Sequence, residues 1–116
     1  AMERTIGLMS VGATLFAASA ALAQAKADIT LAASGKNPSF CMQGDSSFAK
    51  KWSVAVAGDQ ATVSGGNTLT LKKVADGKYE TETTLGGGKL IWTVVAGPSL
   101  SFTVRSTQGC IWEGRS

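Results

Sequence analysis

Apolar and polar residues alternate through most of the chain that follows residue 50. Between Trp52 and Val56 every second side chain is apolar, and the alternation resumes at Ala61 and Val63. A period of two places alternate side chains on opposite faces of an extended strand. The two stretches are separated by Gly58-Asp59, and glycine reaches the positive φ of a two-residue type II′ turn. This region therefore predicts a β-hairpin.

The same pattern predicts strands on both sides of this hairpin, separated by glycine-containing turns. Tyr79–Thr84 is polar and rich in threonine, which favours an exposed or edge strand. Lys89–Val95 is apolar on both faces, which favours a strand covered on both sides. No helical period is found beyond the N-terminal region. The remaining predicted strands are Ile29–Leu31, Phe40–Met42, Leu69–Leu71, Leu100–Arg105 and Cys110–Trp112.

Short strands with turn signals every 8–12 residues or so are typical of an antiparallel sandwich or barrel. For so short a chain a closed barrel is favoured, because closure removes exposed sheet edges. We therefore predict an all-β fold: a small antiparallel barrel of about eight strands. Its predicted core consists of Leu31, Phe40, Trp52, Val54, Val56, Val63, Leu69, Leu71, Leu90, Trp92, Val94, Leu100, Phe102 and Val104.

The N-terminal region has the pattern of a secretory leader. Arg4 supplies a positive charge, and the uncharged stretch Ile6–Leu22 is largely apolar. Ala21-Leu22-Ala23 fits the A-x-A cleavage pattern of signal peptidase, which would leave Gln24 as the new terminus; Ala23-Gln24-Ala25 is a second candidate. The alternative is a transmembrane anchor, but roughly 17 apolar residues lie at the lower limit for crossing a bilayer.

Domain organisation and compartment follow from this leader. We predict a signal peptide at 1–23 and a single β-barrel domain at 24–116, with no stable membrane anchor after cleavage. Ala1 stands ahead of Met2 and is interpreted as a cloning remnant. No cysteine follows the cleavage region directly, so a lipid anchor is not indicated. The expected location is periplasmic or secreted.

Two cysteines, Cys41 and Cys110, lie near the two ends of the predicted domain. In an oxidising compartment they would most simply form one disulfide, closing a loop worth roughly 4 kcal/mol of denatured-state entropy. The alternatives are two reduced thiols in a cytosolic protein, or a metal site, for which further ligands are lacking. We predict that the disulfide closes the barrel.

The chain contains no histidine. This excludes Ser-His and Cys-His nucleophile pairs and the commonest zinc and haem ligation. The few carboxylates stand mostly beside glycine or in polar alternation, where solvated surface positions are expected. We predict that the protein is not an enzyme and holds no metal or cofactor.

The net charge of +3 can be interpreted in two ways. Lys50-Lys51 and Lys72-Lys73 either favour anionic partners or aid solubility. Nucleic acid is not expected as a partner, because no arginine cluster or interleaved aromatics are present. Tryptophans in an apolar alternation are usually buried, and Trp112, beside a polar chain end, is expected to be the most exposed of the three. We predict a protein partner, and a monomer or weak dimer.

Five features spread over residues 28–113 share their order with a known family. They are the early cysteine at Phe40-Cys41, the strand Thr68–Leu71, the turn Gly77-Lys78-Tyr79, the strand around Trp92 and the terminal Cys110. This layout resembles the bacterial inhibitors of C-type lysozyme. The resemblance implies a small barrel with an early-to-late disulfide, exported from the cytosol, which inhibits a hydrolase.

In that family a Ser-Gly-x-x-Tyr turn and a Lys-Gly turn after the tryptophan strand enter the lysozyme cleft. Here the first turn reads Asp76-Gly77-Lys78-Tyr79, with aspartate in place of serine and one residue fewer before the tyrosine. The second turn, Ala96-Gly97, has no lysine before its glycine. The resemblance therefore supports the predicted fold and compartment more strongly than it supports the identity of the inhibitory residues.

A lysozyme cleft holds two catalytic carboxylates, so an inhibitor needs a protruding cation or hydrogen-bond donor on a rigid loop. Lys78 and Lys89 flank the strand Tyr79–Thr84, and we expect them to supply that cation from one end of the barrel. The predicted partner-binding residues are Asp76, Lys78, Tyr79 and Lys89. The alternative is that both lysines are solvated strand-end residues that discourage edge pairing.

Three other functions stay open. A small barrel that inhibits a metalloprotease would insert its N-terminal segment, so Gln24–Asn37 would be mobile, although that family spaces its cysteines more closely. A carrier would hold a small apolar ligand in the barrel mouth, but a barrel of this size fills its interior with its own side chains. A structural or adhesive envelope protein would have no inhibitory activity.

Overall fold

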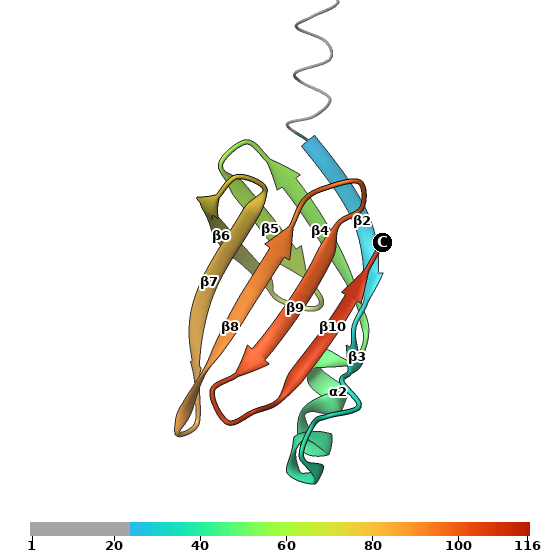
Figure 1. Ribbon diagram of the computed structural model, residues 1–116, viewed down its shortest axis with the longest axis vertical. Coiled ribbons are helices and arrows are strands. Elements are labelled where there is room, and N and C mark those ends of the chain that lie inside the picture. The colour runs from blue at the N-terminus through green and yellow to red at the C-terminus, as the bar shows by residue number, and fades with distance from the viewer. Residues whose placement is uncertain (1–23) are drawn as a thin grey trace, which may run out of the picture.

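Nine strands form one antiparallel sheet in the computed structural model, which describes residues 24–116 (Figure 1). The predicted leader, 1–23, lies outside the described residues. The all-β prediction is confirmed. The strands are β2 (Gln24–Thr30), β3 (Ala32–Ala33), β4 (Lys51–Ala57), β5 (Gln60–Ser64), β6 (Thr68–Ala75), β7 (Lys78–Leu85), β8 (Gly88–Val95), β9 (Ser101–Ser106) and β10 (Ile111–Arg115).

The N-terminal segment nearly closes the sheet into a barrel. The strand order is β2-β4-β5-β6-β7-β8-β9-β10-β3, a meander in which β2 and β3 occupy the two ends. These two strands are separated in sequence by Leu31 alone, so one segment pairs with β4 on one side and β10 on the other. The register places Ala27 opposite Val54 and Ala33 opposite Trp112. The predicted barrel is confirmed.

The predicted hairpin at Gly58-Asp59 is confirmed by the pairing of β4 with β5. Ala57 lies opposite Gln60, which leaves two residues in the turn. Gly58 has a φ of 63°, a conformation that residues with a Cβ rarely adopt.

Alternate residues of the strands fill the interior, as the sequence pattern predicts. Twelve of the fourteen predicted core residues are buried, and Leu69 is half-buried against them. Two expectations are wrong. Phe40 is 52% exposed, and Trp112, expected to be the most exposed tryptophan, is 2% exposed.

Both errors have one cause, a helical segment that the sequence pattern did not reveal. The run Phe40–Met42, predicted as a strand, lies in a 3-10 helix, η1 (Ser39–Gly44), which leads into a single α-helical turn, α2 (Asp45–Phe48). Within three residues, one buried position between two exposed ones fits either conformation. Cys41 faces inward while Phe40 and Met42 face solvent.

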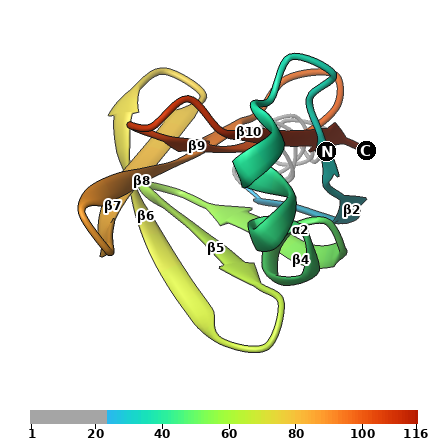
Figure 2. The same ribbon diagram turned by 90° about the horizontal axis from the view of Figure 1, so that it is seen from below.

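This helical segment closes one end of the barrel, lying across the opening between β4 and β10 (Figure 2). Phe48 packs at 4.5 Å from the ring of Trp112 and 5.9 Å from the ring of Trp92, between ring centroids. The Trp112 indole N–H donates to Asp45 Oδ1 at 2.7 Å, and that of Trp52 donates to the Phe48 carbonyl at 3.0 Å. Trp52 and Trp112 therefore satisfy their indole N–H groups through the segment that covers them.

The disulfide bond crosslinks the chain at the same end of the barrel. Cys41 and Cys110 are bonded, with 5.7 Å between their Cα atoms, and both are buried. The predicted bond is therefore confirmed, but it ties the helix η1, and not a second strand, to the start of β10. A disulfide indicates an oxidising compartment. Among residues 24–116, no helix is long and apolar enough to cross a membrane.

The expectation of an exposed or edge strand at Tyr79–Thr84 holds for only part of β7. In the strand order β7 lies between β6 and β8, but its pairing with β6 ends at Glu80, and the rest of the strand pairs with β8 alone. One of its threonines serves the interior, because Thr83 Oγ1 accepts a hydrogen bond from the Trp92 indole N–H at 2.8 Å. This bond satisfies the polar group of a buried tryptophan.

Candidate functional site: the open mouth of the barrel

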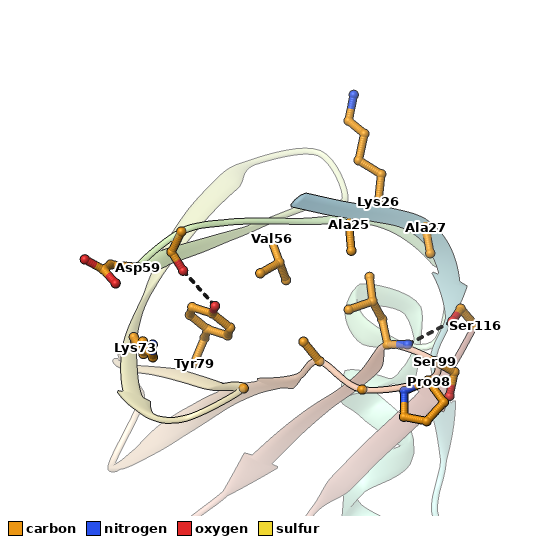
Figure 3. A pocket seen from close by; sticks show the side chains of 15 residues that line it. Ala25, Lys26, Ala27, Val56, Asp59, Lys73, Tyr79, Pro98, Ser99 and Ser116 are labelled. Carbon is orange, nitrogen blue, oxygen red and sulfur yellow. Dashed lines mark hydrogen bonds between the residues drawn. The ribbon is translucent and has the colours of Figure 1, made fainter. Parts of the chain in front are cut away.

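The end of the barrel opposite the helical segment is open and forms a cleft of about 750 Å³ (Figure 3). We call it the mouth cleft. Four structural pieces surround it: the start of β2, the β4–β5 turn, the β6–β7 turn and the loop between β8 and β9. Its lining residues are Ala25, Lys26, Ala27, Val56, Gly58, Asp59, Lys73, Gly77, Tyr79, Ala96, Gly97, Pro98, Ser99, Leu100 and Ser116.

Small side chains explain why the mouth is hollow. Ala25 and Ala27 are the inward-facing residues of β2 at this end, where a larger strand residue would fill the space (Figure 3). The apolar floor is made by Val56, Tyr79 and Leu100, each about 5% exposed. The prediction of a filled interior therefore holds for the closed end but not for the mouth.

Tyr79, one of the predicted partner-binding residues, lies inside the wall of the mouth. Its hydroxyl donates to the Gly58 carbonyl at 2.8 Å (Figure 3). The side chain therefore joins β7 to the β4–β5 turn and holds one side of the mouth in place.

The structure brings the two turns singled out by the sequence to one edge of the mouth. The Ala96 N–H donates to the Gly77 carbonyl at 2.7 Å, so the β6–β7 turn lies against the β8–β9 loop. Gly77 has a φ of 70°, and a Cβ there would lie 2.9 Å from the Ala96 oxygen. We call residues 76–79 and 96–99 together the rim.

Charged side chains project from this rim. Lys78 is exposed at the first position of β7, and Asp76 is fully exposed in the turn before it. Asp76 Oδ1 lies 3.8 Å from Lys73 Nζ. Lys73 also lines the mouth cleft and was not a candidate from the sequence. Lys73 pairs with Tyr79 and lies two residues after the buried Leu71, so strand alternation places it on the inner face, which meets the mouth at this end of β6.

The expectation that Lys78 and Lys89 share one end of the barrel is wrong. β7 and β8 form a hairpin in which Lys78 pairs with Val95 and Lys89 pairs with Thr84. Because eight residues separate the ends of such a strand by about 20–25 Å, the two lysines lie at opposite ends. Lys89 Nζ lies 3.6 Å from Glu82 Oε1, away from the rim.

The chemistry that the mouth offers follows from the residues that line it. Within residues 24–116, no group of three or more histidine, cysteine, aspartate or glutamate residues is placed to hold a metal ion. The mouth offers an apolar floor, exposed lysines and backbone groups of two adjacent turns. The sequence matches no protein-family model, no curated protein and no solved structure.

Proposed function

We propose that this protein is an exported binding protein whose rim inhibits a hydrolase, with a C-type lysozyme as the leading target. The observation that carries the proposal is the contact between Ala96 and Gly77, which joins the two turns into one edge. In the inhibitor family that the layout resembles, the two corresponding turns enter the enzyme cleft together.

The rim also meets the physical requirement for entering an acidic cleft. Lys78 is an exposed cation at the start of β7, where that strand pairs with both β6 and β8. A rigid support lowers the entropy that is lost on binding, because little of the backbone has to be ordered. Lys78 takes the place of the lysine that the second turn lacks, and it would approach the paired catalytic carboxylates.

The compartment supports the same function. A disulfide bond and a predicted secretory leader both fit a periplasmic or secreted protein, which would meet a lysozyme outside the cytosol. The alternative of a metalloprotease inhibitor is disfavoured, because Gln24–Thr30, which would have to be mobile, is paired with β4 along its whole length.

The test is inhibition of a C-type lysozyme by protein expressed from the full chain and purified from the export compartment. We expect inhibition at micromolar concentration. Lys78→Ala should weaken it about 30-fold or more, since losing a cation opposite buried carboxylates costs about 2 kcal/mol or more.

The matched control is Lys89→Ala, which removes the same side chain at the opposite end of the same hairpin. This variant should inhibit as strongly as the native protein. If the native protein leaves lysozyme activity unchanged at micromolar concentration, the proposed target is wrong. If both variants lose inhibition equally, the rim is not the binding surface.

A further inference from the structure

The N-terminal half of β2 has a free edge. In the described part of the chain β2 pairs with β4 alone. On its other side β10 lies against Ile29 and Thr30, where a Cβ on Gly114 would overlap the Thr30 carbonyl and lie 3.0 Å from Ile29 Cγ2. The Ser116 N–H then donates to the Leu100 carbonyl, so the C-terminus is tied to the start of β9 instead. Ala25, Lys26 and Ala27 border the mouth cleft on this side, and no strand of the described chain pairs with them there (Figure 3).

One hydrogen bond shows which residues of β2 direct their backbone N–H and C=O groups toward the free edge. The Leu31 N–H donates to the Lys50 carbonyl at 3.0 Å, so Leu31 directs its backbone groups toward β4. In an antiparallel strand these groups point to alternate sides at alternate residues. Lys26 and Asp28 therefore direct their N–H and C=O groups toward the free edge. The carbonyl of Thr30, which has the same phase, faces Gly114 as this assignment requires.

The two residues that present these groups carry opposite charges on the outer face of the barrel. Both side chains are exposed, and Lys26 points away from the interior (Figure 3). Asp28 Oδ1 accepts a hydrogen bond from the Ser53 hydroxyl at 3.2 Å. A short edge with unpaired backbone groups and one charge of each sign is a template for another strand.

We propose that the free edge of β2 binds β2 of a second copy of this chain, forming an antiparallel two-fold dimer centred on Ala27. In this register Lys26 of one copy lies opposite Asp28 of the other, and the pair occurs twice by symmetry. Both residues direct their backbone groups toward the edge, so each pair also forms two backbone hydrogen bonds.

In the neighbouring symmetric registers, residues of opposite charge do not lie opposite each other. Shifting the centre by one residue places Lys26 opposite Lys26, or Asp28 opposite Asp28, and like charges directly opposite each other are destabilising. The self-complementary charge pattern therefore selects a second copy, in one register, over an arbitrary strand. This inference concerns β2 and does not depend on the proposed inhibitory function.

The dimer should be weak, because it is held by four backbone hydrogen bonds and two exposed ion pairs. We expect sedimentation equilibrium of the exported protein to show a monomer at micromolar concentration and a dimer approaching millimolar concentration. Raising the salt concentration should weaken association, because exposed ion pairs are screened.

Charge variants give the decisive test. Lys26→Asp leaves two acids at the edge and Asp28→Lys leaves two lysines, so each variant alone should associate at least tenfold more weakly than the native protein. Mixed in equal amounts they should form a heterodimer, because every cross-strand pair is again of opposite charge. Circular dichroism of each variant checks that the fold is retained.

The proposal is overturned if the native protein stays monomeric up to millimolar concentration. It is also overturned if a dimer forms that neither charge variant weakens, since the interface would then lie elsewhere, for example at the exposed Phe40 and Met42. Failure of the mixed variants to associate would rule out the register centred on Ala27.

Discussion

The two ends of this barrel are built from different residues. The closed end contains Phe48, Trp52, Trp92 and Trp112 in mutual contact, under a helical segment bonded to β10 by the disulfide. At the open end β2 contributes alanines, and a cleft takes the place of the packed aromatic side chains. Aromatic burial gives each residue of the closed end a large share of the stability. The open end lacks such contacts, and it is the end that carries the proposed binding surface.

The difference explains how a small domain combines stability with an accessible site. A chain of this length buries a limited fraction of its surface and has a thin margin of stability. The aromatic contacts and the covalent bond are concentrated at one end, and the strands that they stabilise continue to the turns at the other end. The following substitutions test this division.

The largest effect is expected for Phe48→Ala. This change removes the ring that contacts Trp92 and Trp112, and it should lower the free energy of unfolding by about 3–5 kcal/mol, as for other buried aromatics. Urea denaturation measures it. Ser99→Ala, an exposed change in the mouth, should stay within about 0.5 kcal/mol of the native protein. Equal effects at the two sites would contradict the division.

Removing the disulfide should have the next largest effect. The double variant Cys41→Ala with Cys110→Ala frees a loop that spans 69 residues, and the chain-entropy estimate is a loss of about 4 kcal/mol. Thermal and urea unfolding of this variant, compared with the native protein under oxidising and reducing conditions, measure the loss. A variant as stable as the native protein would show that the covalent bond contributes nothing to the closed end.

Gly114→Ala tests the closure of the barrel wall. A Cβ at this position would overlap the Thr30 carbonyl and lie 3.0 Å from Ile29 Cγ2, so β10 and β2 would have to separate. We expect a loss of about 1–3 kcal/mol, typical of overpacking. Gly87→Ala is the control, since a Cβ there would meet nothing within 4 Å. A neutral Gly114→Ala would mean that this contact does not hold the wall.

Tyr79→Phe tests whether this tyrosine supports the mouth or contacts the partner. The change removes the hydroxyl that donates to Gly58 and should lower stability by about 0.5–1.5 kcal/mol. Lysozyme inhibition should stay within about twofold of the native value, because the ring is buried. A loss of inhibition with unchanged stability would instead place the hydroxyl in the binding surface.

Much of the barrel could be predicted from the sequence, because strand alternation and turn glycines act locally. Residues 52–56 alternate as a half-buried strand must, and Gly58 marks the turn where β4 reverses. The disulfide followed from compartment and cysteine count. The strands and turns depend on residues that are close together in the chain, and two cysteines can form only one intramolecular disulfide.

The helical segment and the site were harder to predict, because they depend on contacts between distant residues. Trp112 is buried by Asp45 and Phe48, about 65 positions earlier in the chain, so its polar neighbours in sequence were misleading. The separation of Lys78 from Lys89 followed only from the register of the β7–β8 hairpin. Lys73 continues the inward alternation of Leu71, but only the three-dimensional structure shows that this face meets the mouth at the end of β6.

The most direct test of the division between the two ends is to map the lysozyme contact on the protein. Backbone amide signals of the isotopically labelled exported protein would be followed by NMR while unlabelled C-type lysozyme is added. We predict shifts concentrated in residues 76–79 and 96–99, with residues 39–48 unchanged. Shifts centred on 39–48, or no shifts at all, would contradict the account.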